Sequence, residues 1–323
     1  ALLVRTATLF DARGRPYRSL RYAEGAVSST TPSIVSDTWY DAAGRAIKQR
    51  AAGSGAWTKT VYDGAGRPVR SFLSHLAPGH ETDGGCTNSV ADDIVVEQTV
   101  TDYDAASGVT ASRRFLRLPD TSGNGELHYP HPEGGTATPP LGRPYCTCFW
   151  QDPVGRTVAT ADYGSNGGSA VTRPQIIPAS TDIVLVSRTT YDDAGQVERT
   201  TDPQGTVAGR SYDDLGRVVE TIENLVDSPP SVSPADVNRT TLYAYALDGG
   251  LAMLTLKNSV TGDQVTRWIY GTTLVESGVA SSSLLRAKIF PDSPEATDPL
   301  SPPTGDRVEF AYNAQGQVLA TTD

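Results

Sequence analysis

The chain has 323 residues, a formal net charge of −10 and a pI near 4.9. Its 31 glycines and 22 prolines, beside 38% hydrophobic residues, indicate many short elements joined by turns, which favours β structure. No run of Lys or Arg could form the basic stripe that a nucleic acid requires, and no apolar stretch approaches the roughly 20 residues that cross a bilayer. We therefore expect no nucleic-acid partner and no membrane span in this segment.

One short motif recurs along the chain: an aromatic residue, Asp, two variable residues, Gly, and then Arg or Gln. Asp at the first turn position accepts hydrogen bonds from backbone N–H groups, and Gly at the fourth suits a type I turn or a left-handed residue after it. Apolar residues return shortly after each Gly, so each copy predicts a strand, a turn and a second strand. The full copies are Phe10-Asp11 to Gly14-Arg15, Tyr40-Asp41 to Gly44-Arg45, Tyr62-Asp63 to Gly66-Arg67, Tyr191-Asp192 to Gly195-Gln196 and Tyr212-Asp213 to Gly216-Arg217. Weaker copies are Tyr103-Asp104 with one extra residue before Gly108, Asp152 to Gly155-Arg156 without the Tyr, and Tyr312-Asn313 to Gly316-Gln317.

The copies and their interruptions define a predicted order of elements. We expect one repeat domain over 1–323, cut from a longer chain, because the final Thr-Thr-Asp matches a segment inside an earlier repeat. The order is three close copies in 1–74, an insertion at about 75–95, a strand pair at 102–118, a Pro/Gly-rich loop at 119–150, the clearest repeats in 151–227, a Pro-rich insertion at 227–238, strands at 239–257, 264–276 and 284–290, and a Pro-rich insertion at 291–305.

These copies, with the Thr-Thr-Asp-Pro segment between two of them, resemble the YD-repeat, or RHS-repeat, family. The resemblance covers most of the chain. It implies an all-β fold of tandem antiparallel β-hairpin repeats that form part of a spiralling β-sheet shell, or cocoon. It also implies that the repeat Tyr residues stack between neighbouring hairpins, and that the Arg after Gly pairs with nearby acidic groups.

Members of that family are secreted toxin containers, cell-surface proteins and adhesion proteins. We therefore expect a non-enzymatic structural segment of a large secreted or cell-surface protein, forming a β-shell wall that encloses a toxin or other cargo. A cell-surface adhesion or glycan-binding module is the alternative. The expected partners are the rest of the parent chain or further copies of it, an enclosed toxin, or a surface glycan; no cofactor and no catalytic residue are expected.

A self-cleaving toxin-container segment is the second alternative, because some relatives cleave themselves near a D-P-x-G segment. The chain has two such segments, Asp152-Pro153-Val154-Gly155 and Asp202-Pro203-Gln204-Gly205. Both occupy repeat positions, and Pro at the second place with Gly at the fourth fits a type I turn. We interpret both as turns.

The chemically reactive side chains lie where the repeat is interrupted. A disulfide from Cys86 to Cys146 or Cys148 suits a secreted chain and is favoured, while inert thiols remain an alternative. A zinc site of His128, His131 and the Cys146/Cys148 pair is a third reading, although Cys-x-Cys is not the usual zinc spacing.

Residues 120–126 begin like a calcium loop, with Asp120 at the first position, Asn124 at the fifth and Gly125 at the sixth. The twelfth position is His131, where a bidentate Glu is expected, so a polar surface turn is the simpler interpretation.

Overall fold

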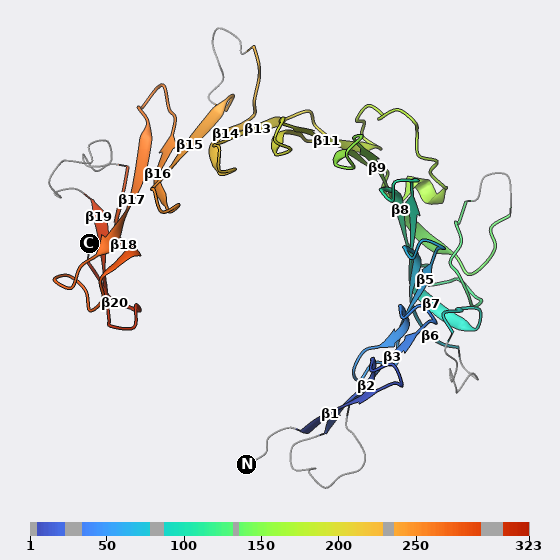
Figure 1. Cartoon of the computed structure of the whole chain (residues 1–323). Helices are drawn as coiled ribbons and strands as arrows, with labels where there is room; N and C mark the ends of the chain where they lie inside the picture. Colours follow the sequence, from blue (N-terminus) through green and yellow to red (C-terminus); the bar gives the residue numbers. More distant parts are fainter. Residues whose placement is uncertain are drawn as a thin grey trace. The chain divides into compact units, whose positions relative to one another are not determined.

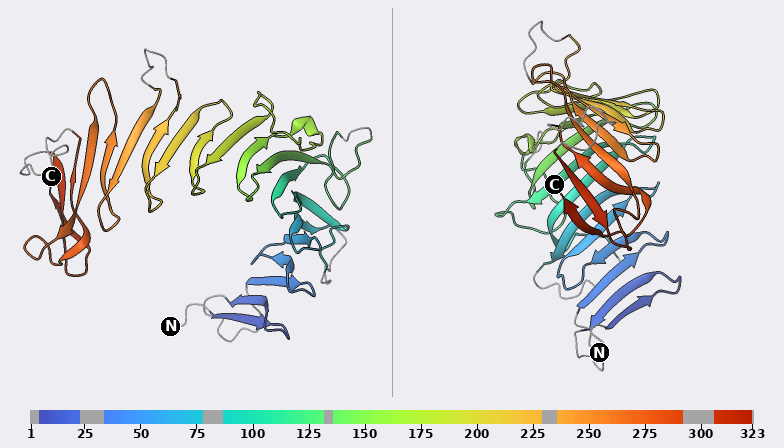
Figure 2. Two further views of the ribbon diagram at one scale, coloured as in Figure 1. Left: turned by 45° about the horizontal axis from the view of Figure 1, so that its top comes forward. Right: turned by 90° about the vertical axis from the view of Figure 1, so that its left-hand side faces the viewer.

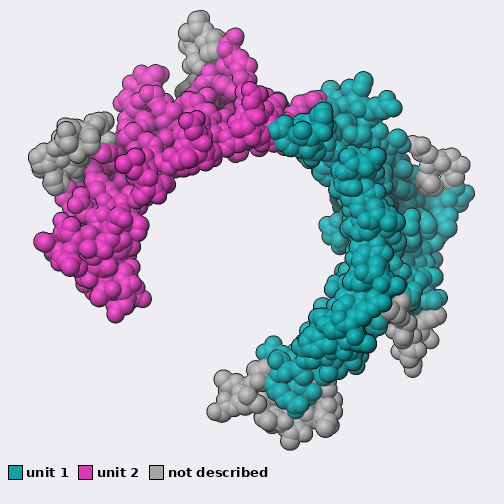
Figure 3. All heavy atoms as spheres, in the orientation of Figure 1, with its two compact units in different colours: residues 1–186 teal, residues 187–323 magenta. Residues whose placement is uncertain are grey.

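The computed structural model describes residues 5–22, 34–77, 87–131, 136–228, 236–291 and 306–322. These residues fall into two compact units, Ala1–Val186 and Ser187–Asp323, drawn in teal and magenta in Figure 3. In the described part of each unit nearly all regular structure is antiparallel β-strand, so the predicted all-β class of tandem hairpins is confirmed. No helix among these residues is long and apolar enough to cross a bilayer.

The first unit is a meander in which each strand pairs antiparallel with the next one along the chain (Figure 1). Its elements are β1 (Arg5–Phe10), β2 (Pro16–Tyr22), β3 (Ile34–Tyr40), β4 (Ala46–Arg50), β5 (Trp57–Tyr62), β6 (Pro68–Leu76), β7 (Asp93–Tyr103), β8 (Val109–Arg117), β9 (Gly142–Gln151), β10 (Thr157–Asp162) and the short 3-10 helix η1 (Asn166–Gly168).

The second unit repeats this arrangement, and its hairpins follow one another in chain order in the left view of Figure 2. Its strands are β11 (Leu185–Tyr191), whose first two residues belong to the first unit, β12 (Val197–Thr201), β13 (Val207–Tyr212), β14 (Val218–Glu223), β15 (Arg239–Tyr245), β16 (Leu251–Leu256), β17 (Gln264–Thr272), β18 (Ser281–Ile289), β19 (Arg307–Tyr312) and β20 (Val318–Thr322).

A β-bulge occurs at the aromatic residue of each motif. In the β5–β6 hairpin, Val61 pairs with Arg70 but the next residue, Tyr62, pairs with Pro68. The extra residue on the second strand is Val69, the third residue after Gly66, and Gly66 has the positive φ of the left-handed residue that closes a type I turn. The sequence motif therefore encodes turn and bulge together.

Apolar residues from the insertions cover the sheet of the first unit. Phe72, Val95 and Phe115 on the strands pack against Val90 and Leu127, which come from the segments between β6 and β7 and between β8 and β9. Residues of these insertions therefore pack onto their own sheet, where they exclude water from the strands beneath them.

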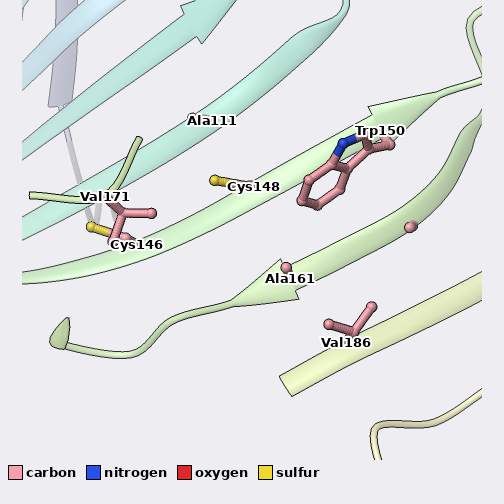
Figure 4. Packing of buried hydrophobic residues seen from close by; sticks show 8 residues of the cluster. Ala111, Cys146, Cys148, Trp150, Ala161, Val171 and Val186 are labelled. Carbon is pink, nitrogen blue, oxygen red and sulfur yellow. The ribbon is translucent and has the colours of Figure 1, made fainter. Parts of the chain in front are cut away.

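A second cluster lies over β8, β9 and β10 (Figure 4). Cys146, Cys148 and Trp150 alternate along β9 on one face, as the period of two in a strand requires. The other buried members are Ala111, Ala159, Ala161, Val171 and Val186.

The segment expected as a loop up to residue 150 instead ends in β9, which begins at Gly142. Gly142 and Pro144 obscured this strand in the sequence, because both residue types are rare in strand interiors. Gly142 fits because a Cβ there would stand 3.0 Å from the Cβ atoms of Leu127 and Phe115. Close packing of the insertion onto the sheet therefore requires glycine at this position.

The second unit has a smaller apolar core. Among its described residues, one buried cluster pairs Val265 with Ile289, and Met253 and Ile269 pack beside it. A sheet with so small a core depends strongly on contacts between successive hairpins.

Candidate functional site

The turn of each repeat is organised by the Asp side chain. In the third copy the backbone N–H of Gly66 donates to the carbonyl of Asp63 (3.0 Å), and Gly66 has φ +86°. Asp63 Oδ1 accepts from the N–H groups of Ala65 and Arg67, each at 2.9 Å, and Oδ2 accepts from Arg67 Nε at 2.7 Å. These donors, first the backbone and then the guanidinium of Arg67, hold the pKa of Asp63 below its ordinary value of 3.8.

Other copies have the same Asp–Arg pair within the turn. In each, Arg Nε or a terminal guanidinium nitrogen lies 2.7 Å from an Asp Oδ2. The pairs are Asp11–Arg15, Asp41–Arg45, Asp152–Arg156 and Asp213–Arg217. In the remaining full copy Gln196 replaces Arg, and only its backbone N–H donates to Asp192, at 2.8 Å.

The turn arginine also reaches the next hairpin. The Arg67 guanidinium lies over the ring of Tyr103 with its Cζ 4.7 Å from the ring centroid, and its Nη1 donates to the carbonyl of Asp104 at 3.0 Å. A guanidinium over an aromatic face is attracted by the ring quadrupole. The same stacking joins Arg15 to Tyr40 (4.5 Å), Arg45 to Tyr62 (4.6 Å) and Arg217 to Tyr245 (4.5 Å).

The tyrosine hydroxyl makes the reverse connection. Tyr103 Oη donates to the carbonyl of Pro68, the second residue after Gly66 in the preceding turn, at 3.0 Å. At least seven such bonds are present in the described residues. Six others join Tyr40 to Pro16, Tyr62 to Ala46, Tyr212 to Val197, Tyr245 to Val218, Tyr270 to Leu251 and Tyr312 to Leu285, at 2.7–3.1 Å.

Asp, Arg and Tyr of the motif thus form what we call the inter-repeat ladder: Asp fixes Arg, Arg stacks on the next Tyr, and that Tyr bonds back to the hairpin before it. Each polar group of the motif is engaged in joining hairpins. The arrangement connects one hairpin structurally to the next at each of these positions.

One member of the ladder, Tyr245, lies outside the copies predicted from the sequence. Tyr245 is followed by Ala246 in place of Asp, yet the turn closes as in the other copies, with Gly249 N–H donating to the Ala246 carbonyl at 2.9 Å. The signal was the aromatic residue four positions before Gly249. Tyr270 lies in an imperfect copy that lacks Asp altogether.

The copy at Tyr103 differs from its sequence interpretation. The sequence suggested one extra residue before Gly108, but Ser107 takes the left-handed position itself, with φ +71°. The turn therefore has the same length as the others, and Gly108 occupies the place of the arginine.

Shallow grooves lie between hairpins at equivalent motif positions of the first unit. One of about 310 Å³ is lined by Asp11, Arg15, Tyr17, Arg18, Asp37, Thr38, Trp39 and Tyr40. A second of about 450 Å³ is lined by Asp63, Arg67, Val69, Arg70, Val100, Thr101, Asp102 and Tyr103.

Both D-P-x-G segments are closed hairpin turns. Gly155 N–H donates to the Asp152 carbonyl and Gly205 N–H to the Asp202 carbonyl, each at 3.0 Å. Asp152 Oδ2 is held by Arg156 Nε at 2.7 Å. Each aspartate thus has the contacts of a turn residue.

Among the described residues the two cysteines of β9 form no disulfide, and both are almost fully buried, with Cys146 1% and Cys148 2% exposed. Burial raises the pKa of both thiols. The hydroxyl of Tyr129 hydrogen-bonds to Cys146, and burial raises the pKa of that tyrosine to about 12. Cys86 lies outside the described residues, so its disulfide remains a prediction.

The remaining metal candidates differ from these thiols in being exposed. Asp120, Asn124, His128 and His131 are exposed, and the backbone of His128 pairs with Leu141 while that of His131 pairs with Ser169. Within the described ranges, no group of three or more His, Cys, Asp or Glu side chains is placed to hold a metal ion. The structure therefore does not assemble the four-residue His and Cys set.

The RHS repeat family model matches residues 191–224, which contain the motif residues Tyr191, Asp192, Tyr212 and Asp213. No curated protein matches the sequence.

Solved structures of Tc toxin proteins are similar to this chain over 98% of its length. A crystal structure of TcdB2-TccC3-TEV is 12% identical with a TM-score of 0.31, and this chain covers 16% of it. One of TcdB2-TccC3 is 13% identical with a TM-score of 0.29 and 20% covered, and the Tc holotoxin pore of Photorhabdus luminescens is 13% identical with a TM-score of 0.29 and 19% covered. The chain thus spans a fifth or less of those chains.

Proposed function

We propose that this RHS-repeat chain is a non-enzymatic structural segment of a large secreted or cell-surface protein, and that its hairpins form part of a wall enclosing a toxin or other cargo. The observation that carries the proposal is the inter-repeat ladder. Its Asp, Arg and Tyr side chains are occupied in joining one hairpin to the next, which is the requirement of a wall and not of an active site.

The repetition of the ladder supports the same function. A catalytic constellation is needed once, whereas the Tyr-to-carbonyl bond occurs at least seven times in the described residues. Repeat proteins are stabilised by terms within each repeat and between nearest neighbours, so a joint present at many positions strengthens the sheet along its length.

Protease protection of the full natural protein tests the enclosure. We expect its cargo region to resist trypsin while the repeats are intact, and to be digested when Tyr40, Tyr62 and Tyr212 are all replaced by Phe. Replacing Tyr17, which has no part in the ladder, is the matched control. Digestion of the cargo region in the unaltered protein, at the rate measured after denaturation, would contradict enclosure.

Self-cleavage is tested separately by the intact mass of the purified chain. The proposal predicts unbroken bonds from Asp152 to Pro153 and from Asp202 to Pro203 after prolonged incubation at neutral pH. Fragments beginning at either proline, absent from Asp152→Ala and Asp202→Ala variants, would favour the self-cleaving alternative.

The adhesion alternative has one specific observation in its favour. The groove of about 310 Å³ presents Tyr17, Trp39 and Tyr40 beside Asp and Arg side chains, a combination that suits a sugar ring with its hydroxyls. If the purified chain binds glycans on an array and the Trp39→Ala variant does not, the adhesion function would be favoured over the wall function.

A further inference from the structure

Three strands of the first unit bring a lysine, a serine and an aspartate together in the protein interior. Lys59 on β5 lies with its Nζ 2.8 Å from Oδ2 of Asp93, the first residue of β7. Ser74, on β6 between them, donates its hydroxyl to the same Oδ2 at 2.5 Å. The three residues are 1%, 2% and 0% exposed in the order Lys59, Asp93, Ser74.

The surroundings of this pair are apolar and fixed. Phe72 is the strand partner of Lys59, and Val95 is the strand partner of Ser74; both belong to the buried cluster that Val90 covers. Lys59 Nζ also donates to the carbonyl of Ser89 at 2.7 Å. The ammonium and the carboxylate are therefore held in contact with water excluded.

A buried ion pair carries a large desolvation penalty, because both charges have lost their hydration. Transfer of one proton from Lys59 Nζ to Asp93 Oδ2 removes both charges and leaves an amine beside a carboxylic acid. Those are the two forms that can condense. Fixed contact between reacting groups also removes much of the entropic barrier to their reaction.

We propose that Lys59 and Asp93 condense into an intramolecular amide, a covalent link between β5 and β7. The Nζ lone pair attacks Asp93 Cγ and forms the C–N bond. A second proton passes from Nζ to Oδ2, the Cγ–Oδ2 bond breaks, and Oδ2 leaves as water. The step needs no oxidant, reductant or other reactant.

Ser74 is the positioning residue of this step. Its hydroxyl donates to the oxygen that departs, so it orients the carboxyl group and can pass a proton to Oδ2 while taking one from Nζ. The amide would link β5 to the start of β7, next to the preceding segment in which Asn88 donates to the Thr60 carbonyl of β5 at 2.9 Å.

The chain contains a matched pair that differs in burial. Lys257 Nζ lies 2.5 Å from Asp263 Oδ2, but those side chains are 48% and 37% exposed. Water hydrates both charges there and competes with condensation, so this pair remains an ion pair.

Mass spectrometry of the purified whole chain is the decisive experiment. We expect the intact mass to be lower than the sequence mass by one water molecule, trypsin to leave the bond after Lys59 uncut, and a branched peptide to join Lys59 to Asp93. Trypsin should cut after Lys257. The Lys59→Arg variant should have the full mass calculated from its own sequence, with no loss of water. A folded unaltered chain with the full sequence mass and normal cleavage after Lys59 overturns the proposal, and that result depends on no variant.

The role of Ser74 has its own readout, the rate at which the water-loss species accumulates after refolding from denaturant. Ser74→Ala is expected to slow accumulation at least tenfold, and Ser74→Thr, which keeps the hydroxyl, to restore it. Equal rates in the unaltered chain and Ser74→Ala would remove Ser74 from the mechanism.

Discussion

The hydroxyl of Tyr62 donates a hydrogen bond to the carbonyl of Ala46, 3.0 Å away in the preceding hairpin, while Arg45 of that hairpin lies over the Tyr62 ring. Two neighbouring hairpins are therefore joined by side chains in addition to the backbone hydrogen bonds between their strands. The bond recurs between other neighbouring hairpins, so its contribution to stability can be measured directly.

Removing this hydroxyl should lower stability modestly. Tyr62→Phe keeps the stacked ring but leaves the Ala46 carbonyl without its side-chain donor, so we expect a loss of about 1 kcal/mol in the free energy of unfolding. Urea denaturation measures it, with Tyr17→Phe as the control. Equal stabilities for the two variants would show that the hydroxyl contributes nothing to the joint.

Two glycines of one turn should respond in opposite directions to the same substitution. Gly66 has φ +86°, so Gly66→Ala should destabilise the protein by about 1–2 kcal/mol through backbone strain. A Cβ at Gly64 has open space and no left-handed φ to adopt, so Gly64→Ala should be neutral or stabilising by up to about 1 kcal/mol. Thermal unfolding of both variants is the measurement, and destabilisation by Gly64→Ala alone would contradict the turn geometry.

Acid should weaken the turns in a defined pH range. The backbone and guanidinium of Arg217 hold the pKa of Asp213 below its ordinary value of 3.8, and Asp11, Asp41 and Asp63 are shifted the same way. Because the folded-state pKa is the lower one, the stabilisation is complete above pH 3.8 and is lost as pH falls from there through the folded value.

Asp213→Asn removes the group that titrates. We expect it to lower stability at neutral pH and to reduce the slope of unfolding free energy against pH below 3.8. Asp214→Asn, at the exposed next position of the turn, is the control. An unchanged slope in Asp213→Asn would refute the assignment.

The buried thiols should be inert in the folded protein. Burial raises the pKa of Cys146 and Cys148, and the thiolate is the reactive form. Iodoacetamide at neutral pH should leave both unmodified in the native chain and alkylate both in denaturant, as peptide mapping would report. Rapid native alkylation of either would contradict the burial.

Truncation of a side chain on the covered face of the first unit should strongly lower the free energy of unfolding. Phe72 is 1% exposed beneath the insertion residues, so Phe72→Ala should cost about 3–5 kcal/mol. Leu73, its neighbour on β6, is 41% exposed, and Leu73→Ala should cost far less. Equilibrium denaturation of the two variants measures the difference in the free energy of unfolding. Similar losses in both would contradict the assignment of Phe72 to the buried face of β6.

The sequence predicted those features whose cause is local. Asp63 and Gly66 specify their turn within four residues, so the hairpins could be placed from the motif alone. Arg67 and Tyr103 are separated in the sequence by an insertion whose conformation the motif does not specify, so their contact could not be predicted from the motif. Stacking between hairpins was expected only from the family resemblance. The Lys59–Asp93 contact was missed because no pattern marks two charges that meet across an intervening strand.

β9 was missed for a different reason. Its Gly142 and Pro144 are typical of loops, and their fitness for this strand depends on Leu127 and Phe115, which approach from elsewhere in the chain. Burial created by distant residues cannot be inferred from local composition.

The ladder is directional within each unit: a hairpin offers its arginine and a carbonyl to the hairpin after it, and its tyrosine to the hairpin before it. Each joint pairs the arginine and carbonyl of one hairpin with the tyrosine of the next. Duplication of one hairpin would therefore create a new joint of the same kind without disturbing the joints on either side. Deletion of one hairpin would likewise bring compatible halves together. This interchangeability allows genetic gain or loss of whole hairpins, while the insertions between strands are free to diversify.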